Sequence, residues 1–335
     1  MMRVKIEDVC MKGSSNLKQS DVVGKNGIYP VYGAAGYLGS IDSFKQSKPY
    51  VAVVKDGAGI GRAMLLPSNS SIIGTMQYLL PKDNILPEYL YYLIKAKHLE
   101  KYYSGATIPH IYFKDYKNEE FDLFSFEIQY QIINKLKIIE KIIEKQKKEM
   151  DLLDELVKAR FVEMFGDIIS NDKNWNSKPL KELCDISRGA SPRPISDYLG
   201  GTIPWIKIGD ATIGDSIYIN STKEHIIKEG VRKSRFIKKG SLIFANCGVS
   251  LGFCRIINFD GCIHDGWLAF QNIDTSLNKI FLLTTINQMT GYFRKIAPGG
   301  TQPNLNTDIV GNYIQVVPPL ELQNQFADFV KEVDK

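Results

Sequence analysis

The chain has 335 residues, of which 44% are hydrophobic and 24% charged, and its formal net charge is +5. This composition is typical of a soluble globular protein with room for two domains, and no run of 18 apolar residues is present to span a membrane. The charged first residues are not those of a signal peptide, and five cysteines without a CxxC pair favour a reducing compartment. We therefore expect a cytoplasmic protein without a membrane partner, whose mild basic excess permits an anionic partner.

Residues 1–125 predict an α+β domain built from short strands, Gly/Pro turns and short helices. The apolar run Tyr50–Val54 predicts a strand, and the glycine-rich segment KDGAGIG (55–61) follows it directly. Residues 87–103, which begin with a proline, predict a helix. The loop GATIPHI (105–111) is rich in turn-forming residues and comes near the end of the domain.

The segment from residue 126 to 165 contains no glycine or proline and predicts one helix of 40 residues. Apolar residues recur along it with a period of seven, which is the pattern of a coiled-coil seam that needs a partner helix. The residues predicted to pack in this seam are Ile132, Leu136, Ile139, Ile143, Met150, Leu153 and Val157. We assign residues 126–167 to a central spacer of about 60 Å, at about 1.5 Å per residue. A long helix buried in a bundle is the alternative.

Residues 168–318 repeat the landmarks of the first domain in the same order. RGASP (188–192) corresponds to KGSSN (12–16), and NCGVSLG (246–252) follows an apolar run as KDGAGIG does. The loop GGTQPNL (299–305) corresponds to GATIPHI at an offset of 194, whereas earlier landmarks have smaller offsets, as loop insertions would produce. The matched order indicates a duplicated domain.

The second copy also predicts a helix over residues 278–293 and the start of a second spacer over residues 319–335. This second spacer matches only 16 of the 40 positions of the first, so we expect it to be truncated. The predicted fold class is α+β, with two similar domains joined by long α-helical coiled-coil spacers.

Combinations of residues typical of catalytic or metal sites are not found in the sequence. The pair Pro318–Pro319 lacks the acidic or amide residue and the aromatic that hold a flipped base in amine methyltransferases. Neither a GxxxxGK[ST] phosphate loop nor a Glu-x-Lys pair occurs. The spacing of Cys247, Cys254, Cys262 and His264 does not match zinc fingers or ribbons, and His264 with the following aspartate is typical of a turn or a core hydrogen bond. We predict no catalytic residues, no metal and no cofactor in this chain.

Basic residues interleaved with Ser, Thr, Asn and Gly suit contacts with DNA phosphates. The densest group lies in KEGVRKSRFIKKG (228–240), which has six basic residues against one glutamate. The candidate DNA-binding residues are Lys12, Lys55, Arg62, Arg188, Arg193, Lys207, Arg232, Lys233, Arg235, Lys238, Thr301, Gln302 and Asn304. For any single lysine the alternative is a solvated surface charge.

Several longer strings resemble those of the specificity (S) subunit of type I restriction–modification enzymes. They are IPWIKIGD (203–210), GGTQPNLN (299–306) and VVPPLELQNQF (316–326), with YPVYGAAG (29–36) and LDELVKARFVEMFGD (153–167) similar again. The first copy departs from this pattern at Ile108 and His110, where the second copy has Gln302 and Asn304.

The resemblance implies that each domain is a target recognition domain that reads one half of a bipartite double-stranded DNA site. It also implies that the two spacers pair antiparallel and that two DNA methyltransferase (M) subunits, which carry S-adenosylmethionine, dock on this frame. Restriction (R) subunits that use ATP and Mg would join them. The chain itself would then be non-catalytic. Two alternatives remain open from the residues: a degenerate DNA methyltransferase or nuclease, and a structural coiled-coil scaffold.

Overall fold

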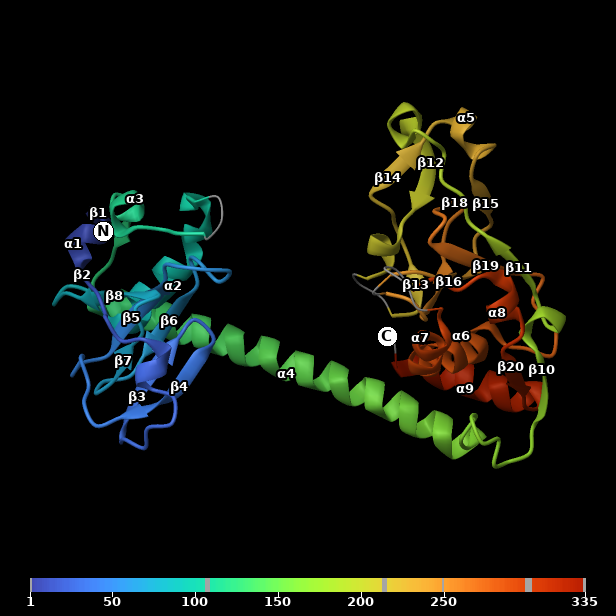
Figure 1. Ribbon diagram of the computed structural model, residues 1–335, viewed down its shortest axis with the longest axis horizontal. Helices are drawn as coiled ribbons and strands as arrows, with labels where there is room; N and C mark the ends of the chain where they lie inside the picture. Colours follow the sequence, from blue (N-terminus) through green and yellow to red (C-terminus); the bar gives the residue numbers. More distant parts are fainter. Residues whose placement is uncertain (1, 106–108, 213–215, 249, 299–302, 334–335) are drawn as a thin grey trace. The chain divides into compact units, whose positions relative to one another are not determined.

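The computed structural model describes residues 2–105, 109–212, 216–248, 250–298 and 303–333, and its chain divides into two compact units, Met1–Lys148 and Glu149–Lys335. Each unit combines β-sheets with helices (Figure 1), which confirms the predicted α+β class. Within the described ranges, no helix is both long enough and apolar enough to cross a membrane.

The first unit contains a four-stranded sheet in the order β2-β8-β5-β6, a three-stranded sheet in the order β4-β3-β7, and the pair β1-β9. Its elements are β1 (Met2–Lys5), α1 (Ile6–Val9), β2 (Cys10–Gly13), η1 (Gln19–Asp21), β3 (Tyr29–Gly33), β4 (Gly36–Ile41), β5 (Tyr50–Val54), β6 (Ala63–Leu66), β7 (Ser71–Ile72), β8 (Met76–Pro81), α2 (Pro87–Ala96), η2 (Leu99–Tyr102), α3 (Phe113–Tyr116) and β9 (Glu120–Leu123). The sequence YVAVV of β5 is apolar throughout because this strand lies between two others and all five of its residues are buried.

The second unit contains a five-stranded sheet in the order β11-β19-β16-β17-β13, a four-stranded sheet in the order β14-β12-β18-β15, and the pair β10-β20. Its elements are β10 (Asn176–Pro179), η3 (Leu180–Glu182), β11 (Asp185–Arg188), η4 (Ile195–Tyr198), β12 (Leu199–Ile206), η5 (Ile208–Ala211), β13 (Tyr218–Ile219), β14 (Glu224–Ile226), α5 (Lys228–Val231), β15 (Arg235–Ile237), β16 (Leu242–Ala245), β17 (Cys254–Ile257), β18 (Gly261–Ile263), β19 (Trp267–Gln271), α6 (Lys279–Gln288), α7 (Thr290–Ile296), α8 (Thr307–Gly311), β20 (Ile314–Val317) and α9 (Leu320–Val333).

The duplication predicted from the sequence is present in the topology. The order β2-β8-β5-β6 in the first unit corresponds to β11-β19-β16-β17 in the second, and β4-β3-β7 corresponds to β14-β12-β18. Even the mixed pairing is repeated, since β3 and β7 are parallel and so are β12 and β18. In each unit the first strand pairs with the last before the following helix. The second unit adds β13 and β15 at the edges of its sheets.

The repeated loop packs against the repeated glycine-rich turn in the first unit. The amide of Gly57 donates to the carbonyl of Pro109 over 3.0 Å, and the amide of Ile111 donates to the carbonyl of Lys55 over 2.9 Å. Gly57 has a φ of +94°, a backbone conformation that residues other than glycine rarely adopt. The glycine-rich segment after β5 and the loop residues Pro109 and Ile111 therefore pack against each other.

The second unit repeats this contact with different side chains. The amide of Gly248, with a φ of +71°, donates to the carbonyl of Pro303 over 3.2 Å. The amide of Leu305 donates to the carbonyl of Asn246 over 2.8 Å. One loop sequence occurs twice because the same backbone contact is made twice.

A single helix, α4 (Phe126–Phe165), occupies the predicted 40 residues (Figure 1). Ile132, near its start, packs against the core of the first unit, and Val157 packs against the core of the second. Between these ends the predicted seam is exposed in the described chain: Ile139 is 50% exposed and Met150 67% exposed. The helix itself is confirmed, whereas its coiled-coil pairing stays a prediction.

Aromatic packing fixes the last turns of α4 within the second unit. The ring of Phe161 lies 5.7 Å from that of Phe281 on α6 and 5.4 Å from that of Phe326 on α9. Phe165 contacts the same two rings. On α9 the buried positions follow the spacing of an amphipathic helix, so this face belongs to the core of the unit.

Both shorter helices predicted from the sequence are interrupted in the structure. The predicted helix 87–103 ends as α2 at Ala96, and η2 follows after His98, which has a φ of +50°. The predicted helix 278–293 is divided at Met289 into α6 and α7. There the Asn287 side chain accepts the amide of Cys254 over 2.6 Å, and these tertiary contacts override local helix propensity.

Candidate nucleic-acid interface

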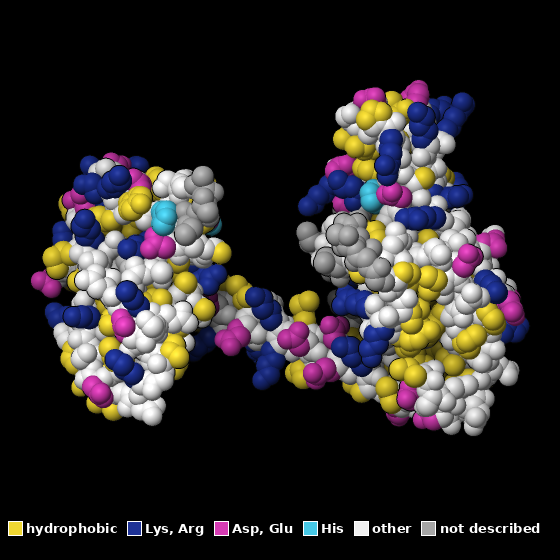
Figure 2. Space-filling model, in the orientation of Figure 1, with side chains coloured by type: hydrophobic (Ala, Val, Ile, Leu, Met, Phe, Trp, Pro, Cys, Tyr) yellow, Lys and Arg dark blue, Asp and Glu magenta, His cyan; other side chains and the backbone are white. Residues whose placement is uncertain are grey.

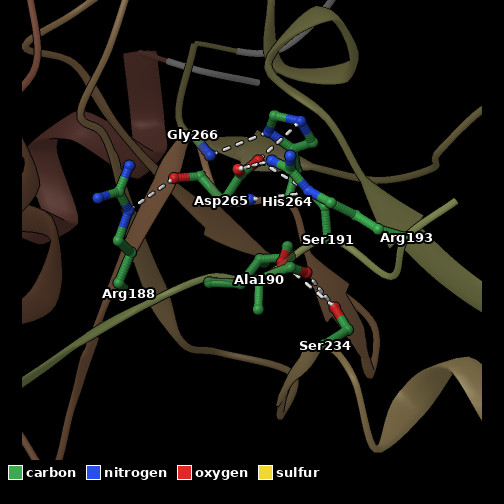
Figure 3. A network of polar contacts seen from close by, with 9 residues as sticks. Arg188, Ala190, Ser191, Arg193, Ser234, His264, Asp265 and Gly266 are labelled. Atoms are coloured by element: carbon green, nitrogen blue, oxygen red, sulfur yellow. Dashed lines mark hydrogen bonds and ion pairs between the residues drawn. The ribbon is translucent and has the colours of Figure 1, made fainter. Parts of the chain in front are cut away.

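Two of the predicted DNA-binding arginines, Arg188 and Arg193, contact Asp265 in the second unit (Figure 3). A third, Arg235, contacts Arg188. The Nε of Arg188, at the end of β11, donates to the Asp265 carbonyl over 3.2 Å. A guanidinium nitrogen of Arg193 lies 3.5 Å from the Asp265 carboxylate. The Nε of Arg235 donates to the Arg188 carbonyl over 3.2 Å. All three side chains are exposed, and we call them, with Asp265, the arginine platform.

The carboxylate of Asp265 is held by two further donors. The hydroxyl of Ser191 donates to its Oδ1 over 2.8 Å, and Nε2 of His264 lies 2.9 Å from the same oxygen. Burial alone would raise the pKa of Asp265, but the Ser191 hydrogen bond, the contact with His264 and the positive charge of Arg193 outweigh it and lower the pKa. Asp265 is therefore an anion at neutral pH in the middle of a basic surface.

His264 serves as a neutral hydrogen-bonding link. The amide of Gly266 donates to Nδ1 of His264 over 2.9 Å, so Nδ1 is an acceptor and the proton is assigned to Nε2, which donates to Asp265. Burial lowers the pKa of His264, with Lys207 and Arg193 adding to this effect and Asp265 opposing it. The prediction of a turn or satisfied hydrogen bond for this dipeptide is confirmed.

Close backbone packing places the segment after β11 beside this network. The amide of Gly189 donates to the carbonyl of Trp267 over 2.9 Å, and a Cβ at Gly189 would lie 2.1 Å from the carbonyl oxygen of His264. The hydroxyl of Ser234 donates to the carbonyl of Ala190 over 2.7 Å (Figure 3). Gly189 is thus required by the close approach of two backbone segments.

The basic run 228–240 does not form one cluster. Arg235 joins the arginine platform, whereas the ammonium of Lys233 lies 2.5 Å from the Tyr198 hydroxyl and 4.9 Å from the centre of its ring. The ammonium of Lys238 pairs with Asp260 over 3.0 Å. The local sequence predicts a dense cluster of positive charge. In the fold, however, Arg235, Lys233 and Lys238 contact three different neighbours: Arg188, Tyr198 and Asp260.

Two other predicted residues of the second unit lie near this region. Lys207 pairs with Glu224 and lies 5.7 Å from the centre of the Trp205 ring, so its charge is partly neutralised. Arg232 is exposed. Figure 2 shows Lys and Arg side chains beside a histidine on the visible face of this unit.

In the first unit, the contact between loop and glycine-rich turn carries an ionisable pair. Nδ1 of His110 lies 2.7 Å from Oδ1 of Asp56, and the ammonium of Lys55 lies 3.8 Å from the same carboxylate. The guanidinium of Arg62 donates to the carbonyl of Ala34, in the turn of the β3–β4 hairpin, over 3.1 Å. Lys55 and Arg62 thus lie on the two sides of one turn.

The remaining predicted residues divide into described and undescribed ones. Lys12 is exposed on β2, and Asn304 is exposed in the second loop, with its Oδ1 3.5 Å from Nδ2 of Asn246. Thr301 and Gln302 lie outside the described residues. In the part of the chain that the structure covers, no group of three or more His, Cys, Asp or Glu side chains is arranged to hold a metal ion.

Sequence reasoning missed Asp265, Ser191 and Tyr198 as members of this interface. Asp265 lies 72 positions from Arg193 in the sequence, and a carboxylate that organises arginines has no short motif. The weak signal was the HDG string, which was correctly assigned to a turn but not connected to the basic residues.

Comparison with known proteins identifies the family. The chain matches the type I restriction modification DNA specificity domain over residues 1–150 and 172–335. The MjaIX specificity subunit of a type I restriction enzyme from Methanocaldococcus jannaschii is 25% identical over 284 residues, 76% of this chain and 63% of that protein. The MjaVIII specificity subunit from the same organism is 23% identical over 311 residues, 85% of this chain and 72% of that protein.

Solved structures share the fold. The S subunit of a type I restriction–modification system from M. genitalium has a TM-score of 0.61 and 17% identity, covering 99% of this chain and 89% of that one. A chain from structural work on complex assembly and conformational transition of the type I R-M system has a TM-score of 0.56 and 16% identity, with the same coverage. With both halves matched by the family's domain, the chain belongs to the family of type I restriction–modification specificity proteins.

Proposed function

We propose that this chain is the DNA-specificity subunit of a type I restriction–modification complex, in which each domain binds one half of a bipartite DNA target. The observation that carries this proposal is the repetition of one sheet order and one loop contact in two units connected by a single helix. Two similar binding domains joined by one helix suit a target made of two short sequences around a gap. The family match and the names of the relatives, both specificity subunits, support it.

The proposed domain limits follow the sequence landmarks. Residues 1–125 and 168–318 form the two recognition domains, residues 126–167 the central spacer, and residues 319–335 the start of a distal spacer. The exposed apolar seam of α4 supports pairing with a second helix, because about 25 cal/mol of stabilisation is lost for each Å² of apolar surface left in water. The length of α4 then fixes the distance between half-sites.

The arginine platform supplies the DNA contacts of the second domain in this proposal. Guanidinium groups present planar sets of donors that match phosphate oxygens and the edge of guanine. Asp265 and the backbone hold these groups before DNA arrives, which reduces the entropy lost on binding. In the first domain, Lys12, Lys55 and Arg62 have the corresponding role.

The chain acts without catalysis of its own in this proposal. Two methyltransferase subunits that bind S-adenosylmethionine dock on the spacer and modify adenine, and restriction subunits use ATP and Mg. Because its partner is the DNA of the cell, the complex works in the cytoplasm. The chain spans 63% of the length of the first relative, so these partners are inferred from the family rather than from the chain.

The test is to co-express the chain with its neighbouring methyltransferase and to map adenine methylation across the genome by single-molecule sequencing. We expect a split motif, with two short specified blocks around a gap of fixed length. Exchange of residues 1–125 for another recognition domain should change one block and leave the other and the gap unchanged. A complex that assembles but methylates no split motif would overturn the proposal.

A further inference from the structure

Each helix that follows a recognition domain has a buried glutamine in its first turn. Gln129 on α4 and Gln323 on α9 are both fully buried, at 0% exposure. Gln323 occurs 194 positions after Gln129, the offset of the repeated loops. A polar side chain without solvent access is stable only if its hydrogen-bonding groups are satisfied.

Gln129 makes three hydrogen bonds with the backbone of its own unit. Its Oε1 accepts the amide of Leu86, the residue before α2, over 2.9 Å. Its Nε2 donates to the carbonyl of Asn84 over 3.2 Å and to that of Phe124 over 2.9 Å. One side chain thus connects α4 to the segment leading into α2 and to the end of β9.

Gln323 makes the same three bonds in the second unit. Its Oε1 accepts the amide of Asn278, the residue before α6, over 2.9 Å. Its Nε2 donates to the carbonyl of Ser276 over 2.9 Å and to that of Pro318 over 2.7 Å. The pattern of one acceptor and two donors fits an amide and excludes a carboxylate, which cannot donate when ionised.

We propose that Gln129 and Gln323 are positioning residues that fix the direction of each spacer helix relative to its own recognition domain. This inference rests on the proposed function, in which helix direction determines where the half-sites lie. The glutamines would thereby determine how strictly the complex measures the gap between the two halves of its target.

The length of the helix gives these few hydrogen bonds a large effect. A 40-residue helix is about 60 Å long at about 1.5 Å per residue. A tilt of about 5° at its base would move its far end by roughly 5 Å, more than the roughly 3.4 Å rise of one base-pair step. Removal of the three hydrogen bonds should therefore permit gaps that differ by one base pair.

The chain offers matched controls two residues further along each helix. Gln131 and Gln325 are exposed, and they are also 194 positions apart. We would compare Gln129→Leu and Gln129→Glu with Gln131→Leu and Gln131→Glu, each in the complex with the methyltransferase. The expected result for the Gln129 variants is methylation of sites with gaps one base pair longer or shorter, at least tenfold above the level in the unaltered complex. The bases of both half-sites should stay the same, and the Gln131 variants should show a single gap.

A second measurement is independent of DNA. Spin labels at positions 42 and 141, both exposed and both in the first unit, report the distance between the domain and the helix. The labelling uses a Cys247→Ser background, because the other four cysteines are buried and only Cys247 would compete for the label. The distance distribution should widen with Gln129→Leu and stay narrow with Gln131→Leu. If Gln129→Leu does not fold, Gln129→Glu carries the same test.

The outcomes separate this inference from the proposed function. A folded Gln129 variant with a narrow distance distribution and a single gap overturns the role of the glutamine. An unaltered complex without a split motif overturns the proposed function, and the spin-label comparison still decides whether Gln129 fixes the helix.

Discussion

Nδ1 of His110 lies 2.7 Å from Oδ1 of Asp56, at an isolated β-bridge between the glycine-rich turn and the loop of the first unit. Cys247 and Asn304 form the corresponding β-bridge in the second unit. The backbone contacts around both bridges are alike, so the fold requires the bridge but not these side chains. Positions at which two copies keep the backbone and change the side chain are suited to different DNA sequences.

The first prediction concerns this bridge. His110→Ala should weaken discrimination at the first half-site only, by about 1–3 kcal/mol at one base pair if the imidazole contacts a base. Asn304→Ala should affect the second half-site only. Methylation mapping of the two variants measures both, and the two variants serve as controls for each other. An effect of either substitution on both halves would contradict separate recognition by the two domains.

The second prediction concerns the anion within the basic surface. Asp265→Ala leaves Ser191 and His264 without their shared acceptor, and it should destabilise the second unit by about 1–3 kcal/mol, measured by thermal or urea unfolding. Asp265→Asn keeps an oxygen acceptor but changes the net charge from +5 to +6.

The two effects of Asp265→Asn on DNA binding should have opposite directions. Binding to unrelated DNA should stay equal or increase because the surface becomes more positive, whereas preference for the correct second half-site should fall because Arg193 loses its ionic partner. A parallel fall in both affinities would show that Asp265 affects folding and not arginine placement.

The third prediction concerns salt dependence. Replacing Arg188, Arg193 and Arg235 together by glutamine should reduce the slope of log K against log salt concentration by about 0.9 for each phosphate that the protein no longer neutralises. The matched control is Lys147, Lys148 and Lys158 of α4 replaced by glutamine, which removes the same charge from the helix. Equal slopes for the two triple variants would exclude the arginine platform from the DNA interface.

The fourth prediction concerns pH and the stability of the first unit. Hydrogen bonds from Lys101 and Tyr102, with Lys97 adding to them, lower the pKa of Glu119 to about 2. A carboxyl group with a lowered folded-state pKa stabilises the fold above its unfolded-state pKa of about 4.5, and this stabilisation is lost as the pH falls towards 2.

Glu119→Gln should accordingly reduce stability at pH 7 by on the order of 1–2 kcal/mol, since solvent screens part of the interaction with Lys101. The difference from the unaltered protein should shrink between about pH 4.5 and 2. Glu120→Gln, which removes an exposed pair with Arg3, is the control and should have little effect. A stability difference between Glu119→Gln and the unaltered protein that persists at pH 2 would show that Glu119 contributes through packing and not through its charge.

Patterns that depend on local spacing could be predicted from the sequence. The 40-residue helix follows from the absence of Gly and Pro and from regular apolar spacing, and the duplication follows from strings such as KDGAGIG and NCGVSLG. The interruption at His98 and the division at Met289 could not be predicted, because left-handed backbone and tertiary bonds to Asn287 override a helical pattern.

The interface was predictable in composition but not in arrangement. The sequence identifies Arg188, Arg193 and Arg235 as basic residues. Asp265, which accepts hydrogen bonds from Arg188 and Arg193, lies 77 and 72 positions away from them. Two arginines that contact one aspartate can be recognised only once the fold brings these distant segments together.

The strands that close each unit have an evolutionary consequence. Met2 pairs with Leu123, and Asn176 pairs with Val317, so the chain enters and leaves each repeat at adjacent points. A segment whose two ends are neighbours can be replaced by another of different length and sequence without moving the chain on either side. Genetic recombination at these two boundaries would therefore give the protein a new target in one step, while the connecting helix is inherited unchanged.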